Sequence, residues 1–170
     1  MGSTLLVLTG LLALSSSDLL AADPSPDTTA AKITREKKLK AKISIDSTDG
    51  SGMMLREILD EIKASVRDTK VDGAKVGAIR IQPDPKAGIT LTTRIKFKVD
   101  KETVEDVLDK MFTASGRPWG YYVNVSKKKD DQEDGAIIIV ADETCRGYPP
   151  GDARNKKSGD KKEEPKKKVK

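Results

Sequence analysis

Two stretches of the chain carry the same helical spacing of apolar residues, and this repetition constrains the fold more than any other feature. Within each stretch, apolar residues recur at intervals of three and four, which places them on one face of a helix. Charged residues such as Arg56, Glu57 and Asp60 occupy the opposite face of the first helix. Each helix must therefore bury its stripe against other elements. The stripes are Leu55, Ile58, Leu59, Ile62 and Val66, and Val104, Val107, Leu108, Met111 and Phe112.

Period-two patterns, typical of half-buried strands, surround the first stripe. Ile43 and Ile45 alternate with polar residues before it, and Ile79 and Ile81 do so after it, up to Pro83. We expect Ser51 to cap the first helix.

The longest alternation runs from residue 89 to residue 99 and predicts one strand with a charged outer face. The odd positions hold Ile89, Leu91, Ile95, Phe97 and Val99, and the basic residues Arg94, Lys96 and Lys98 lie between them. Among these apolar residues, we expect those from position 95 to position 99 to be buried together with both helical stripes.

The second helix should start at Asp100 as its cap and end near Gly116. Residues 119–125 and 135–141 are then predicted as strands joined by a charged hairpin loop. The run 137–140, IIIV, is apolar at every position, which indicates a strand covered on both faces. Trp119, Tyr121 and Tyr122 are interpreted as packing residues of the preceding strand.

The resulting order is strand–helix–strand, then strand–helix–strand–strand. It predicts one α+β domain over residues 41–148, with two amphipathic helices packed on small mixed β-sheets. A ferredoxin-like arrangement is the alternative, because it also uses two βαβ halves.

This order, with its helix motifs, resembles the secretin and TonB N-terminal short domain. Residues 55–59, LREIL, match the first helix motif of that family, and residues 104–108, VEDVL, match the second. Residues 119–123 and 136–140 stand where the family has its Leu-x-Tyr-x-Val strand and its final strand. The resemblance implies a periplasmic interaction module without catalytic residues. We expect the domain here to be a stand-alone exported relative, without a pore or barrel of its own.

The flanking segments are interpreted as processing and linker sequence. Residues 1–22 are predicted to be a signal peptide, because residues 5–14 form an apolar run of signal-peptide length before small residues at 21 and 22. Residues 23–40 are predicted to be a linker whose later part forms a short exposed helix or leads into the first strand. The protein should therefore be periplasmic or otherwise exported, with no stable membrane span after processing.

Residues 149–170 are predicted to be a disordered lysine-rich tail. Residues 151–170 carry nine Lys and Arg against four Asp and Glu, a difference of five that equals the net charge of +5 of the whole chain. The remaining residues are balanced, so the basic character belongs to the tail and is no evidence that the folded domain binds nucleic acid.

The residue inventory limits the chemistry that the chain can perform. There is one cysteine, Cys145, and no histidine, so a disulfide framework and the commonest general base are both excluded. The acidic loop at 130–135 has some EF-hand spacing, but its twelfth position is Ala141 where a bidentate Glu is needed. We therefore predict a protein that is not an enzyme and has no cofactor, catalytic or metal-ligating residues.

The leading functional hypothesis is a protein-interaction module of the bacterial envelope whose partner is another envelope protein. The alternative is binding of a polyanion, either nucleic acid or an acidic envelope polymer, through the basic tail. Candidate partner-binding residues are Arg94, Lys96 and Lys98 on the strand, and Lys161, Lys162, Lys166, Lys167 and Lys168 in the tail.

The predicted export can be tested on the mature protein. Intact-mass spectrometry of protein from its native envelope should show a chain that starts near residue 23. A cytoplasmic chain still beginning at Met1 would exclude processing by a signal peptidase.

Overall fold

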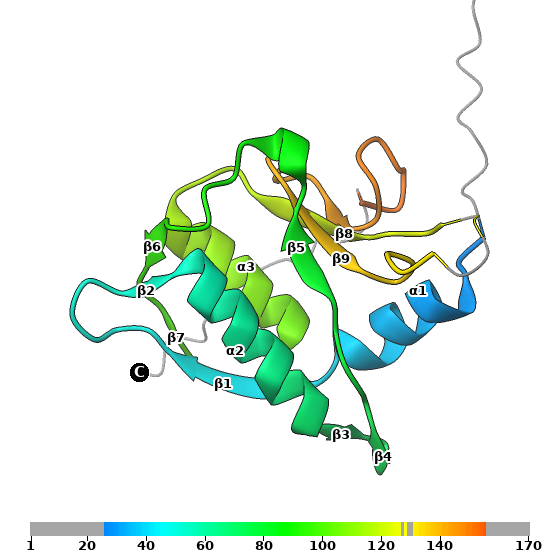
Figure 1. Ribbon diagram of the computed structural model, residues 1–170, viewed down its shortest axis with the longest axis horizontal. Helices are drawn as coiled ribbons and strands as arrows, with labels where there is room; N and C mark the ends of the chain where they lie inside the picture. The colour runs from blue at the N-terminus through cyan, green and yellow to red at the C-terminus, as the bar shows by residue number, and fades with distance from the viewer. Residues whose placement is uncertain (1–25, 127, 129–130, 156–170) are drawn as a thin grey trace, which may run out of the picture.

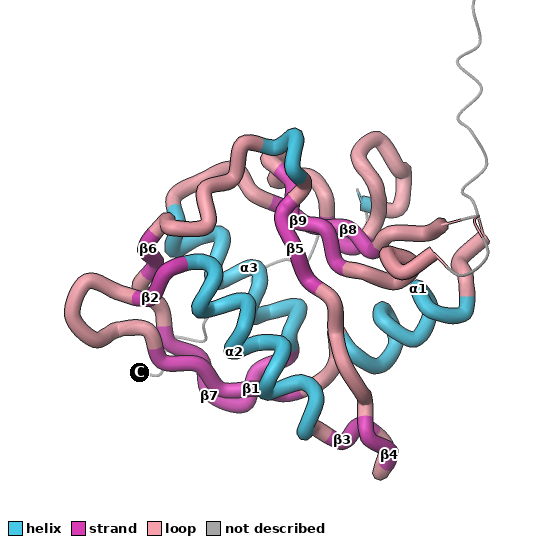
Figure 2. Tube along the Cα trace, in the orientation of Figure 1, coloured by secondary structure: helices cyan, strands magenta, loops and turns pink. Residues whose placement is uncertain are grey.

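The computed structural model describes residues 26–126, 128 and 131–155, and it has an α+β fold (Figure 1). Two longer helices lie side by side in the middle of the domain, α2 (Leu55–Asp68) and α3 (Val104–Ser115). Small sheets surround them, as the tube view also shows (Figure 2). The fold class predicted from the sequence is therefore confirmed.

A mixed four-stranded sheet has the order β10-β8-β9-β5, and it covers one side of the helices. Its central pair, β8 (Gly120–Val123) and β9 (Ile137–Val140), is antiparallel, with Tyr121 opposite Ile139. The two outer strands, β5 (Ile81–Pro83) and β10 (Arg146–Gly147), run parallel to their neighbours.

On the other side of the helices, β1 (Lys42–Asp46) and β7 (Lys98–Thr103) form a two-stranded antiparallel sheet. Shorter pairs are β2 (Met53–Met54) with β6 (Arg94–Ile95), and β3 (Lys70–Val71) with β4 (Ala74–Lys75). The strands are thus divided among several sheets. The single sheet of a ferredoxin-like arrangement, the alternative from the sequence, is not what the described residues form.

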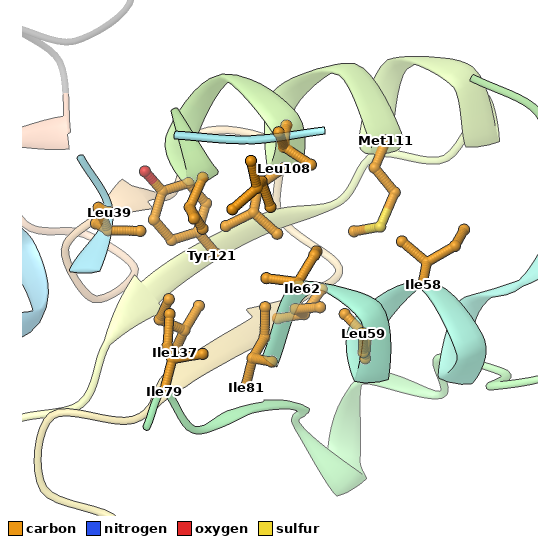
Figure 3. Close-up of a cluster of buried hydrophobic side chains, with 14 of the residues drawn as sticks. Leu39, Ile58, Leu59, Ile62, Ile79, Ile81, Leu108, Met111, Tyr121 and Ile137 are labelled. Atoms are coloured by element: carbon orange, nitrogen blue, oxygen red, sulfur yellow. The ribbon is translucent and has the colours of Figure 1, made fainter. Parts of the chain in front are cut away.

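The core lies between the helices and the two larger sheets. Figure 3 shows side chains of α2 and α3, such as Ile62 and Leu108, next to side chains of the four-stranded sheet, such as Tyr121. Every residue of both helical stripes is at most 2% exposed. Ile95, Phe97 and Val99 are buried too, as predicted. Each such side chain contributes roughly 1.5–3 kcal/mol on burial, so the stripes supply much of the driving force for folding.

The predicted single strand over residues 89–99 is wrong. Only β6 and the start of β7 are strands, and Leu91 is 43% exposed. The reason is a contact with the start of α2. The N–H groups of Leu55 and Arg56 donate to the carbonyls of Thr93 and Leu91, at 2.8 and 3.1 Å. The carbonyls of this segment therefore satisfy the free N–H groups of a helix terminus and are not available to a neighbouring strand.

Both predicted helix caps are also wrong. The N-cap of α2 is Met54, whose N–H donates to the carboxylate of Glu57 at 2.7 Å, and Ser51 has no such role. The N-cap of α3 is Thr103, whose hydroxyl accepts from the N–H of Asp106 at 3.2 Å. Asp100 instead accepts a 2.8 Å hydrogen bond from the Ser44 hydroxyl, between β7 and β1.

The predicted linker is part of the domain from about residue 27 onward. It forms α1 (Thr29–Ile33) and one turn with π-helical spacing, η1 (Thr34–Lys38). Ala31 and Thr34 are fully buried, so this helix is not the exposed one expected. The Thr34 hydroxyl donates to the carbonyl of Gly135 at 2.8 Å. Only glycine fits at 135, where a Cβ would lie 2.8 Å from the carbonyl oxygen of Ala30.

An arginine–tyrosine cluster joins the two ends of the described chain. The guanidinium carbons of Arg35 and Arg154 lie 4.5 and 4.1 Å from the ring centroid of Tyr148. Arg35 also donates to the carbonyls of Gly147 and Val123, and its Nη1 lies 2.5 Å from a carboxylate oxygen of Asp27. The N-terminal helix is thereby fixed to the edge of the four-stranded sheet.

The ordered fold continues past the predicted end at Tyr148 to Asn155, so the predicted start of the tail is too early. Asn155 is buried; its Nδ2 donates to the carbonyls of Tyr148 and Pro149, and its Oδ1 accepts from the N–H of Arg146. The predicted signal peptide and the rest of the tail lie outside the described residues. No helix within the described residues has both the length and the apolar character needed to cross a membrane.

Replacing Asn155 with Leu should destabilise the domain. The substitution removes three hydrogen bonds and leaves the two carbonyls and the N–H of Arg146 without these partners, which costs about 1–3 kcal/mol in free energy of unfolding. Urea denaturation followed by circular dichroism measures this loss. A chain ending at Asn155 is the matched control and should retain the stability of the full chain. An unchanged unfolding midpoint for Asn155→Leu would contradict a structural role for this segment.

Candidate partner-binding surfaces

Three of the basic residues predicted to bind a partner form one exposed strip along β6 and β7. Arg94, Lys96 and Lys98 are all exposed, and they alternate with the buried residues Ile95, Phe97 and Val99. The period-two pattern therefore places the three cations correctly.

Neighbouring groups already take up part of this positive charge. The Lys98 ammonium lies 2.5 Å from the Asp46 carboxylate, and this hydrogen bond raises the pKa of Lys98 and lowers that of Asp46. Arg94 donates to the carbonyl of Gly52 at 2.7 Å. Two of the three cations thus have partners on neighbouring segments of the same chain. An acidic ligand would therefore gain less binding energy here than the sequence indicated.

The tail lysines Lys161, Lys162, Lys166, Lys167 and Lys168, the other candidate binding residues, lie outside the described residues.

A second surface lies on the outer face of the four-stranded sheet, and no pattern in the sequence predicts it. The inner side chains of β8 and β9, such as Tyr121 and Ile139, face the core, whereas Tyr122 and Ile138 pair on the opposite face. Ala136, Ile138, Val140 and Cys145 form a small buried cluster there, with Tyr122 packed against it. The IIIV run is thus covered on both faces, as predicted.

A hollow of about 190 Å³ opens on this outer face beside Tyr122. It draws on β5 and the residues after it, on β8, and on the approach to β9, three segments that the sheet pairing brings together (Figure 2). Its lining combines apolar and polar side chains. The lining residues are Gln82, Pro83, Asp84, Pro85, Tyr122, Asn124, Glu133 and Ile138.

Two carboxylates give this hollow a negative character. Burial and the nearby charges of Asp84, Cys145 and Glu133 raise the pKa of the Tyr122 phenol. Asp84 accepts a hydrogen bond from the N–H of Lys86 at 2.8 Å, and Glu133 accepts one from the Gln82 amide at 3.2 Å. Among the described lysines and arginines, none forms an ion pair with Asp84 or Glu133.

A larger hollow, of about 390 Å³, lies at the end of α3 between Phe112, Arg117, Trp119 and Arg146. Its aromatic residues serve the core, since Trp119 is 6% exposed and meets Phe112 edge to face at 6.4 Å. The Arg146 guanidinium is held by Asp109 at 3.0 Å and by the Cys145 carbonyl. The two aromatic residues and Arg146 in this hollow therefore have structural roles.

Two aspartates in the described part of the acidic loop accept structural hydrogen bonds. Asp131 accepts hydrogen bonds from the Ser126 hydroxyl and from the N–H of Glu133, and Asp134 accepts from Thr28 and Ser126. No group of three or more potential metal ligands is found among the residues that the structure describes.

Comparison with known proteins found no matching family model, no matching curated protein and no matching solved structure.

Cys145 should be chemically inert in the folded protein. It is fully buried, and burial together with the neighbouring Asp142 raises the pKa of its thiol to about 11. The thiolate is the reactive form of cysteine. With the pKa of the thiol raised to about 11, only a minute fraction of Cys145 is ionised near pH 7. Labelling with a thiol reagent should be at least about a hundredfold slower for the folded protein than for the protein in urea. Equal labelling rates in the two states would show that the thiol is accessible and ionised.

Proposed function

We propose that residues 27–155 form a non-enzymatic protein-interaction module of the bacterial envelope, similar to the secretin and TonB N-terminal short domains. The observation that supports this most is the order of the elements. β1, α2, β5 and then β7, α3, β8, β9 follow one another as in that family, and the two matching helix motifs carry their apolar residues into the core.

The surface of the domain fits such a role. The apolar faces of both helices are buried in the core, so a partner would contact sheet faces, strand edges and loops. The outer face of the four-stranded sheet offers a hollow lined by both apolar and hydrogen-bonding side chains, a combination found at protein interfaces. Localisation in the periplasm, and the envelope identity of the partner, rest on the apolar run before residue 22.

A second candidate function, binding of a polyanion through the tail, is favoured by the charge distribution. Residues 156–170 contain eight Lys and three Asp or Glu, and eight minus three equals the +5 of the whole chain. A segment of this composition binds anionic polymers through release of counterions, and such binding weakens steeply as salt is raised.

One experiment separates the two functions. The full chain and a chain ending at Asn155 are each immobilised and exposed to an envelope extract at low salt and at about 0.5 M salt, where exposed charges are strongly screened. Captured proteins are crosslinked and identified by mass spectrometry. For an interaction module, both chains should retain the same partner at high salt.

The controls exclude a purely electrostatic result. The tail alone, fused to an unrelated carrier, should not capture that partner. Loss of all binding on removal of residues 156–170, together with retention by the carrier fusion, would contradict the module and support binding of a polyanion.

A further inference from the structure

We propose that the hollow beside Tyr122 binds a lysine or arginine side chain from a basic segment of the partner protein. This inference rests on the proposed function and names the chemistry of its partner. Three groups carry it: the aromatic ring of Tyr122 and the carboxylates of Asp84 and Glu133.

The three groups converge although they come from different elements. Tyr122 lies in β8, Asp84 follows the edge strand β5, and Glu133 belongs to the loop before β9. The N–H of Asp84 donates to the carbonyl of Ile139 at 2.8 Å, which extends the pairing of β5 with β9 and fixes Asp84 beside the hollow. The hydrogen bond from the Gln82 amide to the Glu133 carboxylate joins Glu133 to β5 as well.

Charge complementarity selects a cation. The two carboxylates have hydrogen-bond donors, but no described lysine or arginine lies within ion-pair distance of either. An anionic ligand would be repelled by both, whereas an ammonium or guanidinium over the ring is attracted by the ring and by the carboxylates.

The size of the hollow selects a side chain. At about 190 Å³ it is smaller than the roughly 300–1,000 Å³ typical of sites for drug-sized ligands. The apolar part of its lining, Ile138 and the two prolines, suits the methylene stem of Lys or Arg, while the charged head meets the carboxylates.

A half-buried cluster elsewhere in the molecule already uses this mode of recognition. The guanidinium groups of Arg35 and Arg154 lie 4.5 and 4.1 Å from the centroid of the Tyr148 ring, and the Asp27 carboxylate contacts both arginines at 2.5 and 3.9 Å. A tyrosine ring with an adjacent carboxylate is therefore a combination that binds arginine in this protein, and the hollow beside Tyr122 presents the same combination to solvent.

The chain's own tail is the competing occupant, and the test must separate it from a partner. Asn155 is bound to Arg146 beside the edge strand β10, and the hollow lies toward the opposite edge strand, β5. With strands about 4.8 Å apart, the sheet from β10 to β5 is only roughly 14 Å wide. The chain continues for fifteen residues after Asn155, and an extended chain spans up to about 3.3 Å per residue, which is enough to reach the hollow. Each measurement therefore uses both the full chain and a chain ending at Asn155.

The probes are short acetylated and amidated peptides in which glycine alternates with arginine or with lysine, and glutamine replaces the cation in the control peptide. Binding is followed by NMR titration of the ¹⁵N-labelled protein. The arginine and lysine peptides should shift the amide signals of Tyr122, Ile138 and Glu133 in both chains, and the glutamine peptide should not.

Isosteric variants test the three groups. Asp84→Asn combined with Glu133→Gln should weaken binding about tenfold, and Tyr122→Leu should do the same, whereas Tyr122→Phe retains the ring and should bind within about twofold of wild type. Glu61→Gln combined with Asp68→Asn removes the same charge from the exposed side of α2 and is the matched control. Circular dichroism and the thermal midpoint identify any variant that fails to fold.

Each outcome decides the proposal. Shifts that are absent in both chains, or that persist in the Asp84→Asn, Glu133→Gln variant, would overturn it. A third outcome is that only the shortened chain binds the peptides, and that the Tyr122 signals of the full chain already lie at their shifted positions. This would show that the tail occupies the hollow and would contradict binding of a partner there. Capture of the same envelope partner by wild type and by the carboxylate variant would reject this inference and leave the proposed function intact.

Discussion

Burial of the two helical stripes against each other and against the two larger sheets is the interaction on which the rest of the structure depends. A helix of 14 or 12 residues is only marginally stable by itself, and in isolation its apolar stripe would be exposed to water. Enclosing both between the β1–β7 sheet and the four-stranded sheet fixes where β5, β8 and β9 lie. The side chains of those strands alternate, so fixing their inner face also determines which residues reach the outer face beside Tyr122.

How much of this fold could be predicted follows from the range of the interactions involved. The helical stripes and the buried IIIV strand are local patterns, and the sequence predicts both correctly. The segment at 89–93 could not be predicted in the same way, because its carbonyls bind the start of α2, more than thirty residues away along the chain. Alternation reports which side chains are apolar, but it does not report the partners of the backbone groups.

The same distinction explains the errors at the ends of the domain and in the binding surface. Thr34 and Asn155 looked like linker and tail residues, because their buried hydrogen bonds are made with distant or poorly patterned segments. The basic residues from Arg94 to Lys98 could be predicted to be exposed, because they alternate with apolar residues. The ion pair of Lys98 with Asp46 could not be predicted from that pattern. The hollow beside Tyr122 has no sequence pattern at all, since Asp84, Tyr122 and Glu133 become neighbours only when β5 pairs with β9 and β9 with β8.

The contact of Asp27 with both Arg35 and Arg154 has a topological consequence. It places the entry and the exit of the folded chain next to each other, at the edge of the sheet formed by β10. Because its two ends are close together, such a domain can be inserted into a loop of another protein without moving the ends of that loop apart. Tension transmitted through its flanking segments would act on the arginine–tyrosine cluster first, before it reached the helices and the core.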